Sequence, residues 1–140
     1  MELSEYIRQI ENMYCGDDSY CEYGCSENDI ELMIQRCKEI APDMYYCTIA
    51  DWVWIDINYT VTSYLKEYHE RELKPCFVRS SQVLFDEAQR PHIRDSVRST
   101  ALIEFYENCI FRTLNTMYIL VGKGSRVSVE AEVLQSMIDW

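Results

Sequence analysis

The chain has 140 residues, and we expect residues 1–140 to form a single domain with a core that needs no disulfides. Hydrophobic residues make up 48% and charged residues 26%, which excludes a disordered chain. Four glycines and three prolines are too few for the turns of an all-β sandwich or barrel. The formal net charge of −11 works against binding of nucleic acid or an anionic membrane, because both attract basic proteins.

The apolar stretches are interrupted by polar residues, so we expect no membrane span. The first residues are acidic, unlike a signal peptide, and we expect a soluble protein of the cytosol. Seven cysteines without a secretory signal argue against a disulfide framework. Cys15, Cys21 and Cys25 lie close together in one predicted loop, where they are either reduced thiols or zinc ligands. Because no C-x-x-C pair is present, we predict no metal site.

Helical periodicity begins at the N-terminus. Apolar residues recur at helical spacing from Leu3 to Tyr14, and a second amphipathic pattern runs from an N-cap at Ser26 to Ala41, before Pro42. Residues 44–61 are rich in strand formers, yet the spacing of Val53, Ile57, Val61, Tyr64, Leu65 and Tyr68 is helical. We therefore predict a helix from Asp51 to Glu72 and leave a strand over residues 44–61 as the alternative.

The second half of the chain is predicted to hold the central element. A short helix over residues 80–89 is followed by a long apolar pattern over residues 93–121, which indicates a helix buried on most sides. Ser128 begins a last predicted helix that reaches Ile138. These elements predict an all-α fold, a bundle of about six helices around the hydrophobic helix 93–121.

We find no catalytic motif and predict that the protein is not an enzyme and uses no cofactor. Of the two histidines, His69 is interpreted as a surface residue near a helix end and His92 as a solvated residue.

A basic group stands out in this acidic chain. Arg90, Arg94 and Arg98 are spaced by four residues, beside the apolar Ile93 and Val97. Such a group suits an amphipathic acidic helix as ligand, whose aspartate meets an arginine and whose apolar residues enter a groove. The alternative is a solvated helix start whose arginines pair with local acids.

Residues 93–106, I-R-D-S-V-R-S-T-A-L-I-E-F-Y, align without a gap with the start of the central helix of Bcl-2-like proteins, approximately F-x-D-G-V-N-W-G-R-I-V-A-F-F. On this ground the chain resembles the divergent viral members of that family. The family's glycine and ligand-binding arginine map to Thr100 and Ala101, and Arg98, one turn earlier, is the candidate substitute.

The resemblance implies a soluble viral inhibitor of apoptosis in the host cytoplasm. Its groove, between helices 51–72, 80–89 and 93–106, would sequester the BH3 helix of a pro-apoptotic protein, with Bim placed before Bak and Bax. The implied groove residues, which read equally well as core, are Tyr64, Leu65, Val83, Leu84, Arg94, Val97, Arg98, Leu102 and Phe105. The alternative function is a helical adaptor or self-associating protein, including a homodimer, that binds a different host or viral partner.

Overall fold

The computed structural model describes residues 1–17 and 21–137. Within them the chain forms a seven-stranded mixed sheet with four α-helices and two short 3-10 helices, so the all-α prediction is wrong. The α-helices are α1 (Leu3–Cys15), α2 (Ile30–Ile40), α3 (Thr62–Glu70) and α4 (Ala131–Gln135), and the 3-10 helices are η1 (Glu27–Asp29) and η2 (Ile93–Asp95). The strands are β1 (Tyr45–Asn58), β2 (Cys76–Asp86), β3 (Val97–Arg98), β4 (Glu104–Tyr106), β5 (Ile110–Arg112), β6 (Thr116–Leu120) and β7 (Ser125–Glu130).

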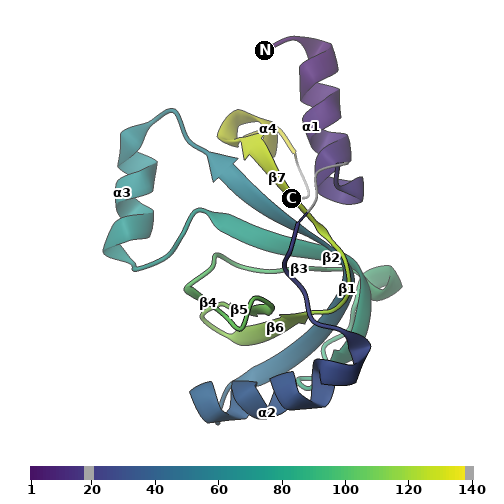
Figure 1. The fold of residues 1–140 in the computed structure, drawn as a ribbon. Coiled ribbons are helices and arrows are strands. Elements are labelled where there is room, and N and C mark those ends of the chain that lie inside the picture. The colour runs from purple at the N-terminus through teal and green to yellow at the C-terminus, as the bar shows by residue number, and fades with distance from the viewer. Residues whose placement is uncertain (18–20, 138–140) are drawn as a thin grey trace.

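The 14-residue strand β1 organises the sheet (Figure 1). It pairs antiparallel with β2 along one edge, whereas its other edge pairs in parallel with β6 over residues 45–49 and with β7 over residues 53–58. Asp51, at φ 47°, lies between these two sections. Because this left-handed residue shifts the inward–outward alternation, Trp52 and Trp54 face the same core cluster as Cys47 and Ile49.

The two ends of the sheet meet in one continuous segment, residues 97–106. Its first part pairs with β2, since Ser99 N–H donates to the Val78 carbonyl at 2.8 Å. Its last part pairs with β5, since Ile103 N–H donates to the Arg112 carbonyl at 2.8 Å. The sheet therefore curls into a ring of hydrogen-bonded segments around the core cluster of Trp52 and Trp54, which we name the first core cluster. Its other buried members are Cys47, Ile49, Cys76, Val78, Leu102, Phe111, Tyr118 and Leu120.

Two further core clusters lie between the ring and its helices. Met13 of α1 and Val133 of α4 pack with β1 and β7 at one end, and Cys37 of α2 packs with β5 and β6 at the other (Figure 1). No helix among the described residues is both long and apolar enough to cross a lipid bilayer.

The first two predicted helices are confirmed as α1 and α2, because each buries one face against the sheet. The predicted helix 51–72 is wrong over its first part: β1 extends to Asn58, and only Thr62–Glu70 is helical. The strand left open for residues 44–61 is therefore the better interpretation.

The remaining helix predictions are wrong. Residues 80–89 belong largely to β2, and residues 93–121 form η2 and strands β3 to β6. All five residues of β6 are buried because the ring core covers one face and α2 the other, so its apolar run resembles a buried helix. The last predicted helix is β7 up to Glu130 and then α4, and the part of that prediction at Ile138 lies outside the described residues.

Candidate functional site

Negative charge is concentrated in the N-terminal third of the chain. Residues 1–43 hold eleven acidic and three basic side chains, a net charge of −8, whereas residues 44–140 hold thirteen and ten, a net charge of −3. The three basic side chains are all paired: Arg8 with Glu5, Arg36 with Glu39 and Glu107, and Lys38 with Glu87. The positive charge in this third of the chain is thus already neutralised locally.

The uncompensated carboxylates gather in residues 22–31, which we name the acidic segment. It contains four exposed acids and no basic residue: Glu22, Glu27, Asp29 and Glu31. None of the four is in an ion pair within the part of the chain that the structure describes. The charge of this segment is therefore directed at solvent or at a partner.

Backbone hydrogen bonds hold the acidic segment against the sheet. Gly24 N–H donates to the Asn108 carbonyl at 2.9 Å, Cys25 N–H donates to the Leu120 carbonyl at 2.9 Å, and Gly122 N–H donates back to the Cys25 carbonyl at 2.8 Å. Gly24 has φ 111°, and a Cβ atom there would overlap the Gly122 carbonyl. The carboxylates are consequently presented from a fixed backbone, which lowers the entropy lost on binding.

An exposed apolar side chain adjoins these acids. Leu32 of α2 is 57% exposed, and its sequence neighbour Glu31 and the later Gln35 and Glu39 on α2 are exposed as well. In a complex such an apolar side chain can lie at the centre of the interface while the polar residues around it form the rim.

A separate cleft lies beside the arm formed by α3 and its connections. Two cavities of about 370 and 440 Å³ share Tyr59, Tyr68, Thr100 and Ala101 in their walls. The hydroxyls of Tyr59 and Tyr68 are 3.0 Å apart, and burial together with this bond raises the pKa of Tyr59. Glu67, Arg71 and Arg98 give the walls charges of both signs, so the lining does not select a ligand by charge.

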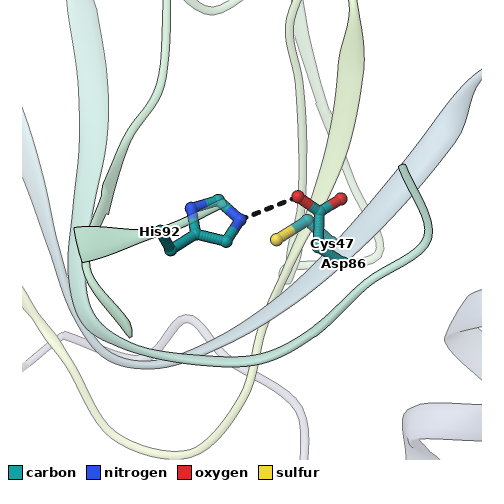
Figure 2. Close-up of side chains that lie close together, drawn as sticks. All are labelled: Cys47, Asp86 and His92. Atoms are coloured by element: carbon teal, nitrogen blue, oxygen red, sulfur yellow. Dashed lines mark hydrogen bonds and ion pairs between the residues drawn. The ribbon is translucent and has the colours of Figure 1, made fainter. Parts of the chain in front are cut away.

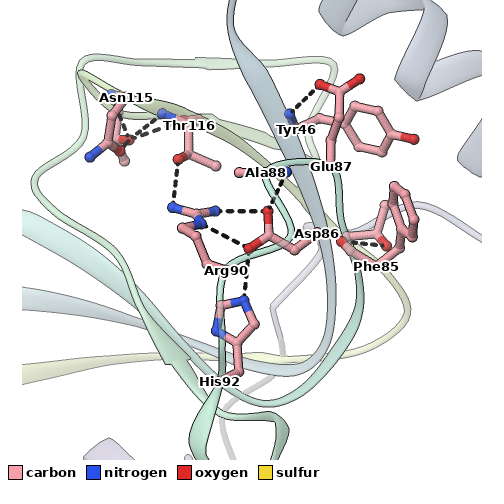
Figure 3. Close-up of polar contacts among 11 residues, drawn as sticks. Tyr46, Phe85, Asp86, Glu87, Ala88, Arg90, His92, Asn115 and Thr116 are labelled. Carbon is pink, nitrogen blue, oxygen red and sulfur yellow. Dashed lines mark hydrogen bonds and ion pairs between the residues drawn. The ribbon is translucent and has the colours of Figure 1, made fainter.

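A buried polar network closes the far end of β2 (Figure 3). The Asp86 carboxylate accepts hydrogen bonds from Arg90 Nε at 2.8 Å and Nη2 at 3.1 Å, and from Ala88 N–H at 3.0 Å. His92 Nε2 lies 2.8 Å from the same carboxylate, and Arg90 also donates to Thr116 Oγ1 at 3.1 Å. Burial opposes the Asp86 charge, but these partners outweigh it and lower the pKa of the carboxyl.

Cys47 lies directly opposite Asp86 in the β1–β2 register, beside this network. Its side chain has no exposed surface, and burial raises the pKa of its thiol to about 12. A substrate cannot reach a fully buried sulfur, and a protonated thiol is a poor nucleophile. The proximity of Cys47 and His92 therefore does not make a nucleophilic centre.

The predicted groove residues do not line one surface. Tyr64 and Leu65 are exposed on α3, Leu84 on β2, Arg94 on η2 and Arg98 on β3. Another four, Val83, Val97, Leu102 and Phe105, meet in the first core cluster. The core interpretation is correct for these four.

The sequence interpretation missed Cys47, Asp86 and His92 as a group. Their positions are 39 and six residues apart, and no short motif joins them. Only the pairing of β1 with β2 brings Cys47 to Asp86, and that pairing was hidden by the helix predictions for both segments.

Residues 22–136 match the family described as Domain of unknown function (DUF6957), and because the match covers most of the chain, the protein belongs to that family. No curated protein and no solved structure matches the chain. These comparisons give no link to Bcl-2-like proteins.

Proposed function

We propose that this domain acts by binding a basic partner protein through the acidic segment and Leu32. The observation that carries the proposal is the rigid display of four exposed carboxylates that have no ion-pair partner among the described residues. Charges of opposite sign steer association and penalise wrong partners. Leu32 would supply the apolar contact that charge pairs alone do not provide.

The same charge distribution disfavours two other classes of ligand. Polyanions are repelled by a chain of net charge −11, and two copies of the acidic segment repel each other. Among the functions expected from the sequence, an adaptor that binds a different protein therefore has more support than self-association. The seven cysteines are free thiols, which suits the reducing cytosol that we propose as the location.

Sequestration of a BH3 helix by a viral inhibitor stays an untested prediction. Its groove requires helices at residues 80–89 and 93–106, and these segments form strands and loops with a single 3-10 turn at Ile93–Asp95. We therefore expect BH3 peptides of Bim, Bak and Bax to show no saturable binding in calorimetry at tens of micromolar. Tight binding would contradict this expectation and revive the earlier hypothesis.

Two variants with equal charge change test the proposed surface. The first combines Glu27→Gln, Asp29→Asn and Glu31→Gln, and its matched control combines Glu67→Gln, Glu70→Gln and Glu72→Gln on the α3 arm. The wild-type protein and the two variants are each immobilised, and the proteins that they retain are compared. A protein that the wild type retains is a candidate partner, and it is then purified and titrated by calorimetry at several salt concentrations.

We expect the first variant to weaken a 1:1 complex about tenfold, the effect of losing roughly 0.5 kcal/mol per charge pair. The control should change the affinity by less than about twofold, and the wild-type affinity should fall as salt rises. Equal losses in the two variants, or no partner that distinguishes them, would show that the acidic segment is not the binding surface.

A further inference from the structure

We propose that Cys47, Asp86 and His92 form a binding site for a soft divalent metal ion such as Zn²⁺. Figure 2 shows the three side chains converging from β1, the end of β2 and the loop that follows it. The Cys47 sulfur, a carboxylate oxygen of Asp86 and a ring nitrogen of His92 all lie within 4.8 Å of one another. No other group of three such ligands comes together in residues 1–17 and 21–137, so Cys15, Cys21 and Cys25 do not converge there.

The donor set identifies the class of metal. Thiolate, imidazole and carboxylate are the ligands of tetrahedral zinc, whereas Ca²⁺ and Mg²⁺ require six or more oxygen ligands. Ligands at about 2.0–2.3 Å in tetrahedral geometry lie roughly 3.3–3.8 Å apart. The His92–Asp86 distance of 2.8 Å therefore has to increase by only about 0.5 Å to admit the ion between these two atoms.

The movable ligand is His92. Cys47 and Asp86 are fixed by strand pairing, whereas His92 follows Pro91 in a loop that contains left-handed residues at Gln89 and Arg94. His92 lines a cavity of about 420 Å³ together with Pro91, Ile93 and two arginines, Arg79 and Arg98, so the histidine is the ligand on the solvent side of the site. Cys47 has no exposed surface, so an ion reaches its sulfur only when the His92 loop moves outward. Three protein ligands leave the fourth tetrahedral position for a solvent molecule.

Arg90 is the obvious objection, because it places a positive charge on the Asp86 carboxylate. The two hydrogen bonds from Arg90 and the one from Ala88 N–H nevertheless leave a lone pair of Asp86 Oδ2 directed at His92. The metal would lie in that direction. Hydrogen-bonded partners of this kind orient ligating carboxylates in metal sites. With one thiolate, one carboxylate, Arg90 and Zn²⁺, the local charge is +1, inside a protein of net charge −11.

Metal binding has a defined proton balance. The Cys47 thiol loses its proton to solvent as the sulfur–metal bond forms. The ring proton of His92 moves from Nε2 to Nδ1, and Nε2 exchanges its hydrogen bond with Asp86 for a nitrogen–metal bond. No oxidation or reduction takes place, and one proton is released for each ion bound.

The test uses the reduced, metal-free full-length protein, titrated with Zn²⁺ in a calorimeter and with Co²⁺ in a spectrophotometer. We expect one ion per chain and a thiolate-to-cobalt charge-transfer band with the visible bands of tetrahedral Co²⁺. His92→Gln should weaken binding at least about tenfold, since removal even of groups that only orient ligands costs 10–100-fold. His69→Gln, which changes the other histidine of the chain, should leave binding unchanged.

A double variant, Cys15→Ser with Cys21→Ser, controls for binding at the more accessible thiols and should retain the cobalt spectrum. The proposal is overturned if wild-type protein binds no stoichiometric ion, if the charge-transfer band is missing, or if binding disappears in the Cys15/Cys21 variant. An equal effect of His92→Gln and His69→Gln would also overturn it. Should His92→Gln fail to fold, the wild-type spectrum and the Cys15/Cys21 variant still decide the question.

Discussion

Strand β1 and helix α3 are neighbours in the chain and opposites in their surroundings. Four consecutive residues of β1, Trp52 to Ile55, are buried, because core clusters lie on both faces of the strand. Helix α3 buries none of its residues and stands away from the sheet (Figure 1). The helical spacing of apolar residues thus runs across two different elements. Strand β1 forms much of the core, whereas α3 contributes almost nothing to it.

The largest expected difference between the two elements is in stability. Trp52→Ala should lower the free energy of unfolding by about 3–5 kcal/mol, since it empties a 1%-exposed site and removes the indole bond to the Gly122 carbonyl. Tyr64→Ala, at a 44%-exposed site on α3, should change it by less than about 0.5 kcal/mol. Urea unfolding followed by circular dichroism measures both, and similar losses would show that α3 is part of the core.

A smaller effect tests how tightly the Trp52 side of β1 is packed. A Cβ atom on Gly124 would overlap the Trp52 ring, so Gly124→Ala should cost about 1–3 kcal/mol. Gly122→Ala is the matched control. Its chain neighbours aside, no atom of the described residues lies within 4 Å of a Cβ placed there, and its φ of 72° opposes alanine at about 1 kcal/mol. In thermal unfolding, the Gly124→Ala variant should have a lower melting temperature than the Gly122→Ala variant. The reverse order would contradict the packing described for Trp52.

The smallest effect concerns alkaline pH at the base of the α3 arm. Burial, with the hydrogen bond between the Tyr59 and Tyr68 hydroxyls, raises the pKa of Tyr59 in the folded protein, so the neutral form is favoured there. Stability from this group is complete below the unfolded pKa of about 10 and is lost as pH rises above it, because the unfolded tyrosine then ionises first. Tyr59→Phe should lose less stability than wild type between pH 9 and 11 (roughly one unit either side of that pKa). Urea unfolding at each pH measures the difference, and equal losses in the two proteins would contradict the raised pKa of Tyr59.

The sequence was sufficient for α1 and α2 because each helix has one buried and one exposed face, the condition under which periodicity is informative. It was insufficient for β6, where burial on both faces removes the alternation that marks a strand. Two local features that redirect the chain are the left-handed conformations of Asp51 and Arg94. Neither residue is glycine, and although aspartate adopts this conformation more often than most residues, it does so too rarely for Asp51 to mark the irregularity in β1.

The candidate sites differ in the same way. The acidic segment follows from counting charges along the chain, and the structure adds that its backbone is fixed and its carboxylates lack ion-pair partners among the described residues. Cys47, Asp86 and His92 depend on strand register and loop closure, so they could not be grouped before the fold was known. The basic group at Arg90, Arg94 and Arg98 is evident from the sequence, but in the structure Arg90 turns inward to Asp86 and the three share no helical face.

The isolation of α3 has a practical consequence for engineering. An element that buries no residue can be lengthened or interrupted with little penalty to the fold, so a fluorescent reporter or an affinity tag can be spliced into the chain near residues 60–62. Such an internal fusion would leave both termini and the acidic segment unaltered, and it would allow the protein to be followed in living cells.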